Sequence, residues 1–235
     1  MAGEKCFQHT QDAAAQCKAC EKHICKDCQE MYGAESGAYK GESLCYECVI
    51  GLGAESTANI AHLRKKVNME RIVAAVAAVI LILVLTAVFR DMTGAGLNVW
   101  LGILIGIFLG GVVGMLPETI SRFKSGDVGG GVICIFGAFF VMIKTRNDQL
   151  KQCIEIASGD SIVIEKMRNY LAYVQFMEKN EGVDLARLTA QGGRLSGNTY
   201  AADVLEKGEE TACAELRQGV NQIIANNEIT KKFGK

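Results

Sequence analysis

The sequence lacks a surplus of charge of either sign. Its 235 residues include 25 basic and 26 acidic side chains, which leaves a net charge of −1. From residue 144 to the end the balance is again even, without a run of like charges. Proteins that bind nucleic acid need a basic surface to meet the phosphate backbone. We therefore expect no nucleic-acid partner.

Two common catalytic patterns are also missing. The chain has three histidines, His9, His23 and His62, and all of them precede the first long apolar segment, which leaves no Ser-His-Asp set to assemble. The glycine-rich stretch 125–131 leads into an apolar segment without the Gly-Lys-Ser/Thr ending of a phosphate-binding loop. We expect a protein that is not an enzyme.

The first 70 residues contain no apolar run, and the first long one begins at Ile72. A secretory signal peptide needs an apolar core near the N-terminus. The head of the chain is rich in cysteine, and thiols persist where the surroundings are reducing. We therefore expect the head to stay in a reducing compartment.

Seven of the ten cysteines lie within residues 1–48, where they form pairs with two residues between the partners. With His9 there are four such pairs: Cys6 and His9, Cys17 and Cys20, Cys25 and Cys28, and Cys45 and Cys48. Eight ligands is the number that two closed tetrahedral zinc sites require. A redox-active Cys-x2-Cys would need a strand-helix-strand setting, which this polar stretch does not provide. The head is predicted to bind two structural zinc ions.

The spacing of the pairs decides which of them share an ion. Only four residues separate the second pair from the third, so joining these two would force a very tight loop onto one ion. Alternating pairs avoid this and give a cross-brace, although a sequential arrangement stays open. The cross-brace assigns one zinc to Cys6, His9, Cys25 and Cys28, and the other to Cys17, Cys20, Cys45 and Cys48.

Residues 6–48 resemble the B-box family of zinc fingers, in which cross-braced pairs run Cys-x2-His, Cys-x2-Cys, Cys-x2-Cys and a last pair. The stretches "CFQH", "CKAC" and "CKDC" match this order. The last pair, "CYEC", has cysteines where many B-boxes have histidines, and the gap before it is long. The resemblance implies a protein-protein interaction module. A RING finger is the neighbouring alternative, because "CEKHIC" contains a Cys-x2-His-x-Cys, but it would leave Cys17 without a role.

Three apolar segments follow the head, at 72–89, 97–116 and 128–143, and none contains an Asp, Glu, Lys, Arg or His. As helices the first two reach roughly 27 and 30 Å, which is enough to cross the hydrocarbon of a bilayer. The third is shorter, so it is either a tilted span or a re-entrant segment, and we favour the span. Ionisable groups inside spans usually mark transport pathways, so a transporter is not indicated.

Residues 51–71 link the head to the first span. Glycines at 51 and 53 are expected to end the finger, and Ser56 or Thr57 to cap a basic juxtamembrane helix. In a three-span topology six basic residues lie on the head side and four on the other side. The positive-inside rule then places the head in the cytoplasm. The head-side residues are Arg64, Lys65, Lys66, Arg71, Arg122 and Lys124, against Arg90, Lys144, Arg146 and Lys151.

A stripe of glycines runs along the second span at every fourth residue. Small residues at this spacing let another helix approach closely. The third segment offers small residues at the same spacing, so we expect contact between these two segments, with homo-oligomerisation through the stripe as the alternative. The stripe is Gly102, Gly106, Gly110 and Gly114, and the predicted counterpart is Gly130, Cys134 and Ala138.

From residue 144 onward, apolar residues recur at helical spacing in two stretches, 163–177 and 204–224. We expect a small helical bundle or hairpin there. The predicted fold is a zinc-stabilised finger, an all-α membrane region of two or three transmembrane helices and an α-helical C-terminal region. The corresponding domains are 1–50, 51–71, 72–143 and 144–235.

The function that fits these features is that of a membrane-anchored interaction or assembly module, held in the lipid bilayer and binding a protein partner that the sequence does not identify. Two alternatives stay open. One is an oligomeric pore or effector assembled through the glycine stripe, and the other is a RING-like membrane ubiquitin ligase.

Overall fold

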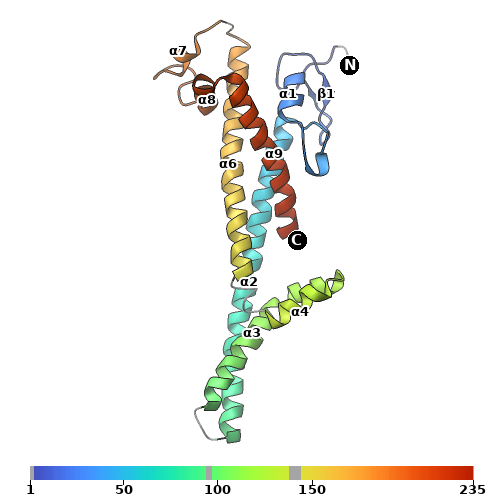
Figure 1. Cartoon of the computed structure of the whole chain (residues 1–235), viewed down its shortest axis with the longest axis vertical. Helices are drawn as coiled ribbons and strands as arrows, with labels where there is room; N and C mark the ends of the chain where they lie inside the picture. Colours follow the sequence, from blue (N-terminus) through green and yellow to red (C-terminus); the bar gives the residue numbers. More distant parts are fainter. Residues whose placement is uncertain (1–2, 94–96, 138–143, 181, 235) are drawn as a thin grey trace. The chain divides into compact units, whose positions relative to one another are not determined.

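A computed structural model describes residues 3–93, 97–137, 144–180 and 182–234. The chain is mostly helical, and its helices follow a small irregular head (Figure 1). The head contains strand β1 (Ala15–Gln16), strand β2 (His23–Ile24), helix α1 (Lys26–Met31) and the 3-10 helix η1 (Gly37–Tyr39). The helices that follow are α2 (Tyr46–Thr93), α3 (Leu97–Lys124), α4 (Val128–Phe136), α6 (Arg146–Met177), α7 (Leu185–Thr189), α8 (Thr199–Lys207) and α9 (Glu209–Gly234).

Helix α2 begins earlier than the sequence indicated. It starts at Tyr46, inside the last Cys-x2-Cys pair, and continues through both glycines of the expected linker. The hydroxyls of Ser56 and Thr57 donate to the carbonyls of Leu52 and Gly53, 3.0 and 3.1 Å away. Because these are bonds within a helical turn rather than caps, the predicted helix start at these residues was wrong.

The chain folds into two compact units. One comprises residues 1–60 and 154–235, and the other residues 61–153. The first unit therefore combines the head with most of the C-terminal helices, which the sequence had placed in separate domains. Helices α2 and α6 contribute residues to both units.

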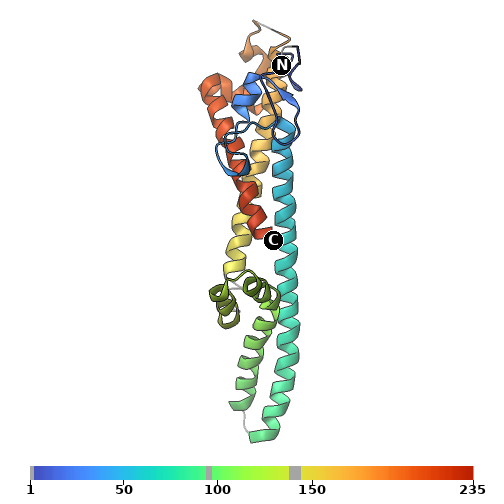
Figure 2. The same cartoon turned by 90° about the vertical axis from the view of Figure 1, so that its right-hand side faces the viewer.

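In the first unit the head packs against α9, which runs beside it in both views (Figures 1 and 2). The Glu35 N–H donates to Asn221 Oδ1 at 2.9 Å, and the Ala38 N–H donates to Glu228 Oε1 at 2.6 Å. Farther along α9, Asn227 Nδ2 donates to the carbonyl of Leu52 at 2.9 Å. One buried cluster joins the two parts, including Met31, Tyr32, Leu44 and Val49 with Met167, Leu216, Val220, Ile223 and Ile224.

In the second unit α2 and α3 form an antiparallel pair (Figure 2). The glycine stripe of α3 faces α2 rather than the third apolar segment, so the predicted partner of the stripe was wrong, although the expected contact between α3 and α4 is present. A Cβ placed on Gly110 would lie 2.5 Å from the Cβ of Ala78, and one on Gly106 would lie 2.9 Å from the backbone nitrogen of Ile82. Only glycine allows the two backbones to approach this closely. The full set pairs Gly102, Gly106, Gly110 and Gly114 with Thr86, Ile82, Ala78 and Ala74.

The third apolar segment is represented by α4, which ends at Phe136 and is capped by Gly137. Cys134 is buried with Met115 of α3 and Ala74 of α2. The backbone N–H of Gly130 donates to the N-cap Asp127 at 2.9 Å. Ala138, the third residue of the predicted counterpart, lies outside the described residues.

Two helices among the described residues are long and apolar enough to cross a membrane, within Tyr46–Val88 and Trp100–Lys124. Their side chains are widely exposed, with Leu83, Trp100 and Leu104 each more than 60% accessible. Apolar surface on this scale is unusual for a water-soluble monomer.

Replacing Gly110 with alanine should weaken the α2–α3 pair by about 2 kcal/mol, because the new methyl group overlaps the backbone of Ala78. Thermal unfolding in detergent, followed by circular dichroism, measures the change. Gly129→Ala is the matched control, since nothing lies within 4 Å of the added carbon. Equal melting temperatures for the two variants would contradict the packing.

Asp160 of α6 is 2% exposed and accepts a hydrogen bond from Asn226 of α9 at 2.7 Å. Burial raises its pKa from 3.8 to about 6, although the bond from Asn226 opposes the shift. The folded state therefore binds this proton more tightly than the unfolded chain does, and stability is lost as the pH rises from about 4 to about 6.

We expect Asp160→Asn to raise the free energy of unfolding, relative to the unsubstituted chain, by an amount that grows to about 2 kcal/mol above pH 6. Urea unfolding of both proteins between pH 4.5 and 7.5 tests this expectation. A difference that stays constant over this range would show that Asp160 does not titrate as described.

Candidate metal centres

The head brings the eight predicted ligands together in two groups. The first contains Cys6, His9, Cys25 and Cys28, and the second Cys17, Cys20, Cys45 and Cys48. Within each group all the ligand atoms lie within 4.8 Å of one another. This grouping is the one that the cross-brace requires. Each group can hold one metal ion.

The local fold explains why the pairs interleave. Strands β1 and β2 pair antiparallel, with Ala15 opposite Ile24. The turn between them carries Cys17 and Cys20 away from the strand end that leads to Cys25. Cys25 is the N-cap of α1, and Cys28 lies in its first turn. The second pair therefore faces the start of α2, where Cys45 and Cys48 complete the other group.

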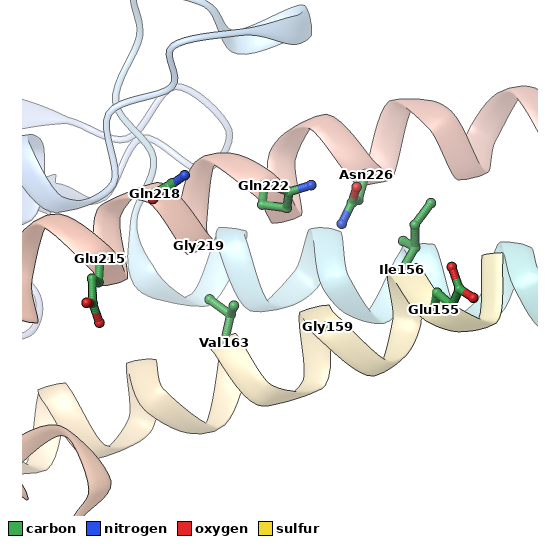
Figure 3. A pocket seen from close by; sticks show the side chains of 9 residues that line it. All are labelled: Glu155, Ile156, Gly159, Val163, Glu215, Gln218, Gly219, Gln222 and Asn226. Carbon is green, nitrogen blue, oxygen red and sulfur yellow. The ribbon is translucent and has the colours of Figure 1, made fainter. Parts of the chain in front are cut away.

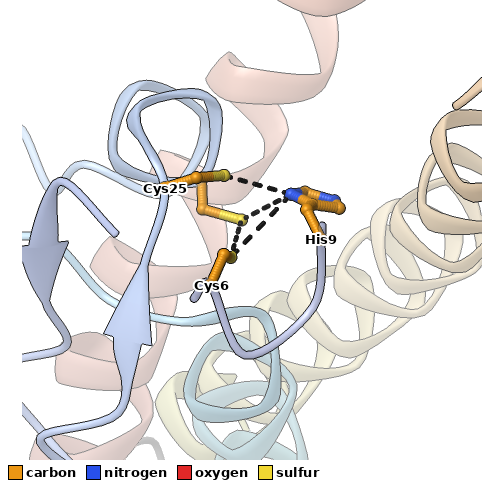
Figure 4. A group of neighbouring side chains, drawn as sticks. Cys6, His9 and Cys25 are labelled. Atoms are coloured by element: carbon orange, nitrogen blue, oxygen red, sulfur yellow. Dashed lines mark hydrogen bonds between the residues drawn. The ribbon is translucent and has the colours of Figure 1, made fainter. Parts of the chain in front are cut away.

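In the first group the Nδ1 atom of His9 points at the sulfurs (Figure 4). It lies 3.1 Å from Cys25 Sγ, 3.4 Å from Cys28 Sγ and 4.0 Å from Cys6 Sγ. The sulfurs of Cys6 and Cys28 are 3.9 Å apart. All four residues are buried.

In the second group the sulfurs of Cys20 and Cys45 are 3.6 Å apart. Cys17 and Cys45 are buried, whereas Cys20 is exposed and Cys48 is partly exposed. Lys22 lies beside this group and donates a hydrogen bond to the carboxylate of Glu47. Its Nζ atom also lies over the ring of Phe7, 3.7 Å from the ring centroid. Its positive charge offsets part of the charge that four thiolates would carry.

These distances fit Zn²⁺. A tetrahedral ion with Zn–S bonds of about 2.3 Å holds its sulfurs roughly 3.8 Å apart, whereas a disulfide would bring them to about 2.05 Å. All ten cysteines are free. Sulfur and imidazole nitrogen are the donors that structural zinc sites use, and each group supplies four of them.

Backbone amides point at two of the sulfurs. The N–H of Cys45 lies 3.1 Å from Cys17 Sγ, and the N–H of Gln8 lies 3.5 Å from Cys6 Sγ. Such donors stabilise a thiolate and fix its direction toward an ion.

The thiols of the first group strongly affect one another. A hydrogen bond from Cys28 lowers the pKa of Cys25 to about 3, and the same contact raises the pKa of Cys28. A hydrogen bond with Cys25 raises the pKa of His9, although burial opposes it. Cys25 therefore loses its proton more readily than Cys28, because two close negative charges repel one another. A dication lets all the thiols ionise together.

His23 stays outside both groups, and its Nε2 lies 3.0 Å from Glu4 Oε2. A separate groove of about 480 Å³ lies between α6 and α9, beside Gly159 and Gly219 (Figure 3). The described residues that line it include no cysteine, histidine or serine. The groove therefore adds no metal ligand to the head.

Metal analysis of the purified full chain should find two zinc ions per molecule. Cys48→Ser should reduce the content to one, because it removes a ligand from the second group alone. Cys213→Ser, which changes a cysteine outside both groups, should retain two. Inductively coupled plasma mass spectrometry makes the measurement, and a metal-free wild-type protein would overturn the assignment.

Comparison with known proteins finds no family model, no curated protein and no solved structure that matches this chain. The two metal centres therefore rest on their donor atoms and their geometry.

Proposed function

We propose that this protein is a membrane-anchored interaction module, in which a B-box-like head with two zinc ions and the C-terminal helices form one recognition unit beside the bilayer. The observation that carries the proposal is the packing of the head onto α9 in a chain that also has two exposed apolar helices. A recognition unit of this kind binds partners or copies of itself without catalysing a reaction.

Packing of the head onto the C-terminal helices supports an even number of membrane crossings. The contacts of Glu35 with Asn221 and of Ala38 with Glu228 require both ends of the chain to lie on the same side of the membrane. The chain must then cross an even number of times. The hairpin of α2 and α3 supplies two crossings.

Ion pairs in the second unit also support two membrane crossings. Arg146, which follows the third apolar segment, lies 3.4 Å from Glu70 and 2.9 Å from Glu118. Arg122 lies 3.0 Å from Asp127, which precedes that segment, and 3.2 Å from Glu118. Both ends of the segment thus meet the same cluster of charges. A crossing would separate them by about 30 Å, so we assign the third segment to the head side rather than to a span.

The two-span topology sharpens the prediction of orientation. Nine basic residues near the spans now lie on the head side, and Arg90 alone lies on the other side. The positive-inside rule then favours a cytoplasmic head, where thiols stay reduced. The nine are Arg64, Lys65, Lys66, Arg71, Arg122, Lys124, Lys144, Arg146 and Lys151.

The two alternative functions have less support. The glycine stripe packs against α2 of the same chain, so it is not left open for the assembly of a pore. A RING arrangement would recruit His23 as a ligand, but this residue pairs with Glu4. Cys17, which a RING would leave aside, lies within the second group.

Epitope tags at the N-terminus, at the C-terminus and between residues 94 and 95 test the topology in sealed, oriented vesicles. Protease should remove both terminal tags from the same face and reach the middle tag only from the opposite face. Flotation of the vesicles on a density gradient tests the anchor separately.

Terminal tags on opposite faces would overturn the two-span topology but leave the anchor intact. A chain that stays in the soluble fraction would overturn the anchor itself. The two results are distinguishable because flotation does not depend on which face the tags occupy.

A further inference from the structure

A second pocket of the first unit lies where three parts of the chain meet. It has a volume of about 420 Å³ and is bounded by α1 of the head, by α6, and by α8 with the start of α9. The pocket exists only because the head packs onto the C-terminal helices. None of the eight metal-ligand residues lines it, although Asp27 of the lining lies between Cys25 and Cys28 in the sequence.

One wall of the pocket is aromatic. Tyr170 and Tyr173 of α6 meet Tyr200 of α8, with ring centroids 5.0 and 5.4 Å from that of Tyr200. The rings are steeply inclined to one another and largely buried, which fixes their orientation. The π-face of a tyrosine attracts a cation at close range.

The rest of the lining is acidic. Four carboxylates line the pocket, those of Asp27, Glu30, Glu178 and Glu209, against the single cation of Arg217. Arg217 lies 3.9 Å from Glu30 and so offsets one of the four. The carboxylate of Glu209 makes no hydrogen bond or ion pair with another of the described residues. The Oε1 atom of Glu178 is buried and has no hydrogen-bond partner among them.

Several of these charges act on Cys213, which also lines the pocket. Burial raises the pKa of the Cys213 thiol, and the negative charges of Glu209, Glu30 and Asp27 raise it further, against the opposing effect of Arg217. Three carboxylates from two separate elements therefore act on the same small volume. An anionic ligand would be repelled there, and a neutral ligand would leave the carboxylates without a positive partner.

We propose that this pocket binds the cationic side chain of a lysine or arginine on a partner protein. The aliphatic part of the side chain would lie against the tyrosine rings, and its charged end would reach the carboxylates. The inference rests on the proposed function, because it names the partner chemistry of the interaction module. The pocket itself needs only the first unit and is independent of membrane insertion.

The full chain in detergent micelles, loaded with zinc, is titrated with a fluorescent peptide of glycine and serine that carries three spaced lysines. The same peptide with norleucine in place of lysine keeps the aliphatic chains and removes the charge. Fluorescence anisotropy should report binding of the lysine peptide alone, and binding should weaken as salt is added.

Glu209→Gln should weaken binding of the lysine peptide about threefold, since it removes one carboxylate and keeps the shape of the side chain. Glu210→Gln is the matched control, because Glu210 is the next residue of α9, is exposed and lies outside the pocket. Tyr173→Leu should also weaken binding, because it removes the π-face and keeps an apolar wall.

Equal affinities of the Glu209→Gln and Glu210→Gln variants would overturn the proposal, as would equal binding of the norleucine peptide or no binding of either peptide. Zinc content and flotation are measured on each variant. If they are unchanged while binding fails, the pocket assignment is wrong and the anchored module stands.

Discussion

The convergence of eight sulfur and nitrogen donors from residues 6–48 into two groups is the constraint on which the first unit depends. Two strands of two residues each and a helix of six residues cannot build an apolar core by themselves. The ligand groups take the place of that core, because each ties a segment near the N-terminus to a segment farther along the chain. The interleaved order makes the head one body instead of two separate knuckles.

Once the head is fixed, it covers apolar surface that the C-terminal helices would otherwise expose. Met31 and Leu44 of the head belong to the same buried cluster as Met167 and Ile223. Backbone N–H groups of the head donate hydrogen bonds to side chains of α9, and these bonds fix the orientation of the head on the helix. The surface of the first unit is therefore composite, because the head and the C-terminal helices both contribute to it.

Small residues organise the second unit in a different way. Glycines on α3 and alanines on α2 bring two backbones together without large side chains between them. At the end of this hairpin, Arg146 joins Glu70 and Glu118 from three different helices. Buried charges of this kind need partners, so the cluster holds the start of α6 against the middle of α2 and the C-terminal part of α3.

Local patterns determined much of this protein. The Cys-x2-Cys and Cys-x2-His spacing identified the eight candidate ligands, and the short gap between the second and third pairs favoured the grouping that the structure has. Length and apolar composition identified the two long helices of the hairpin. In α2, the Ala74-x3-Ala78 pattern is also present in the sequence, but small residues at this spacing do not by themselves indicate which helix they pack against.

Contacts between distant residues were decided only by the tertiary structure. Glu35 and Asn221 are 186 positions apart, and neither residue carries a local signal that it pairs with the other. The same holds for the carboxylates and tyrosines of the acidic pocket, which come from separate helices. Periodicity shows that a helix has an apolar face, but the partner of that face depends on shape and burial across the whole fold.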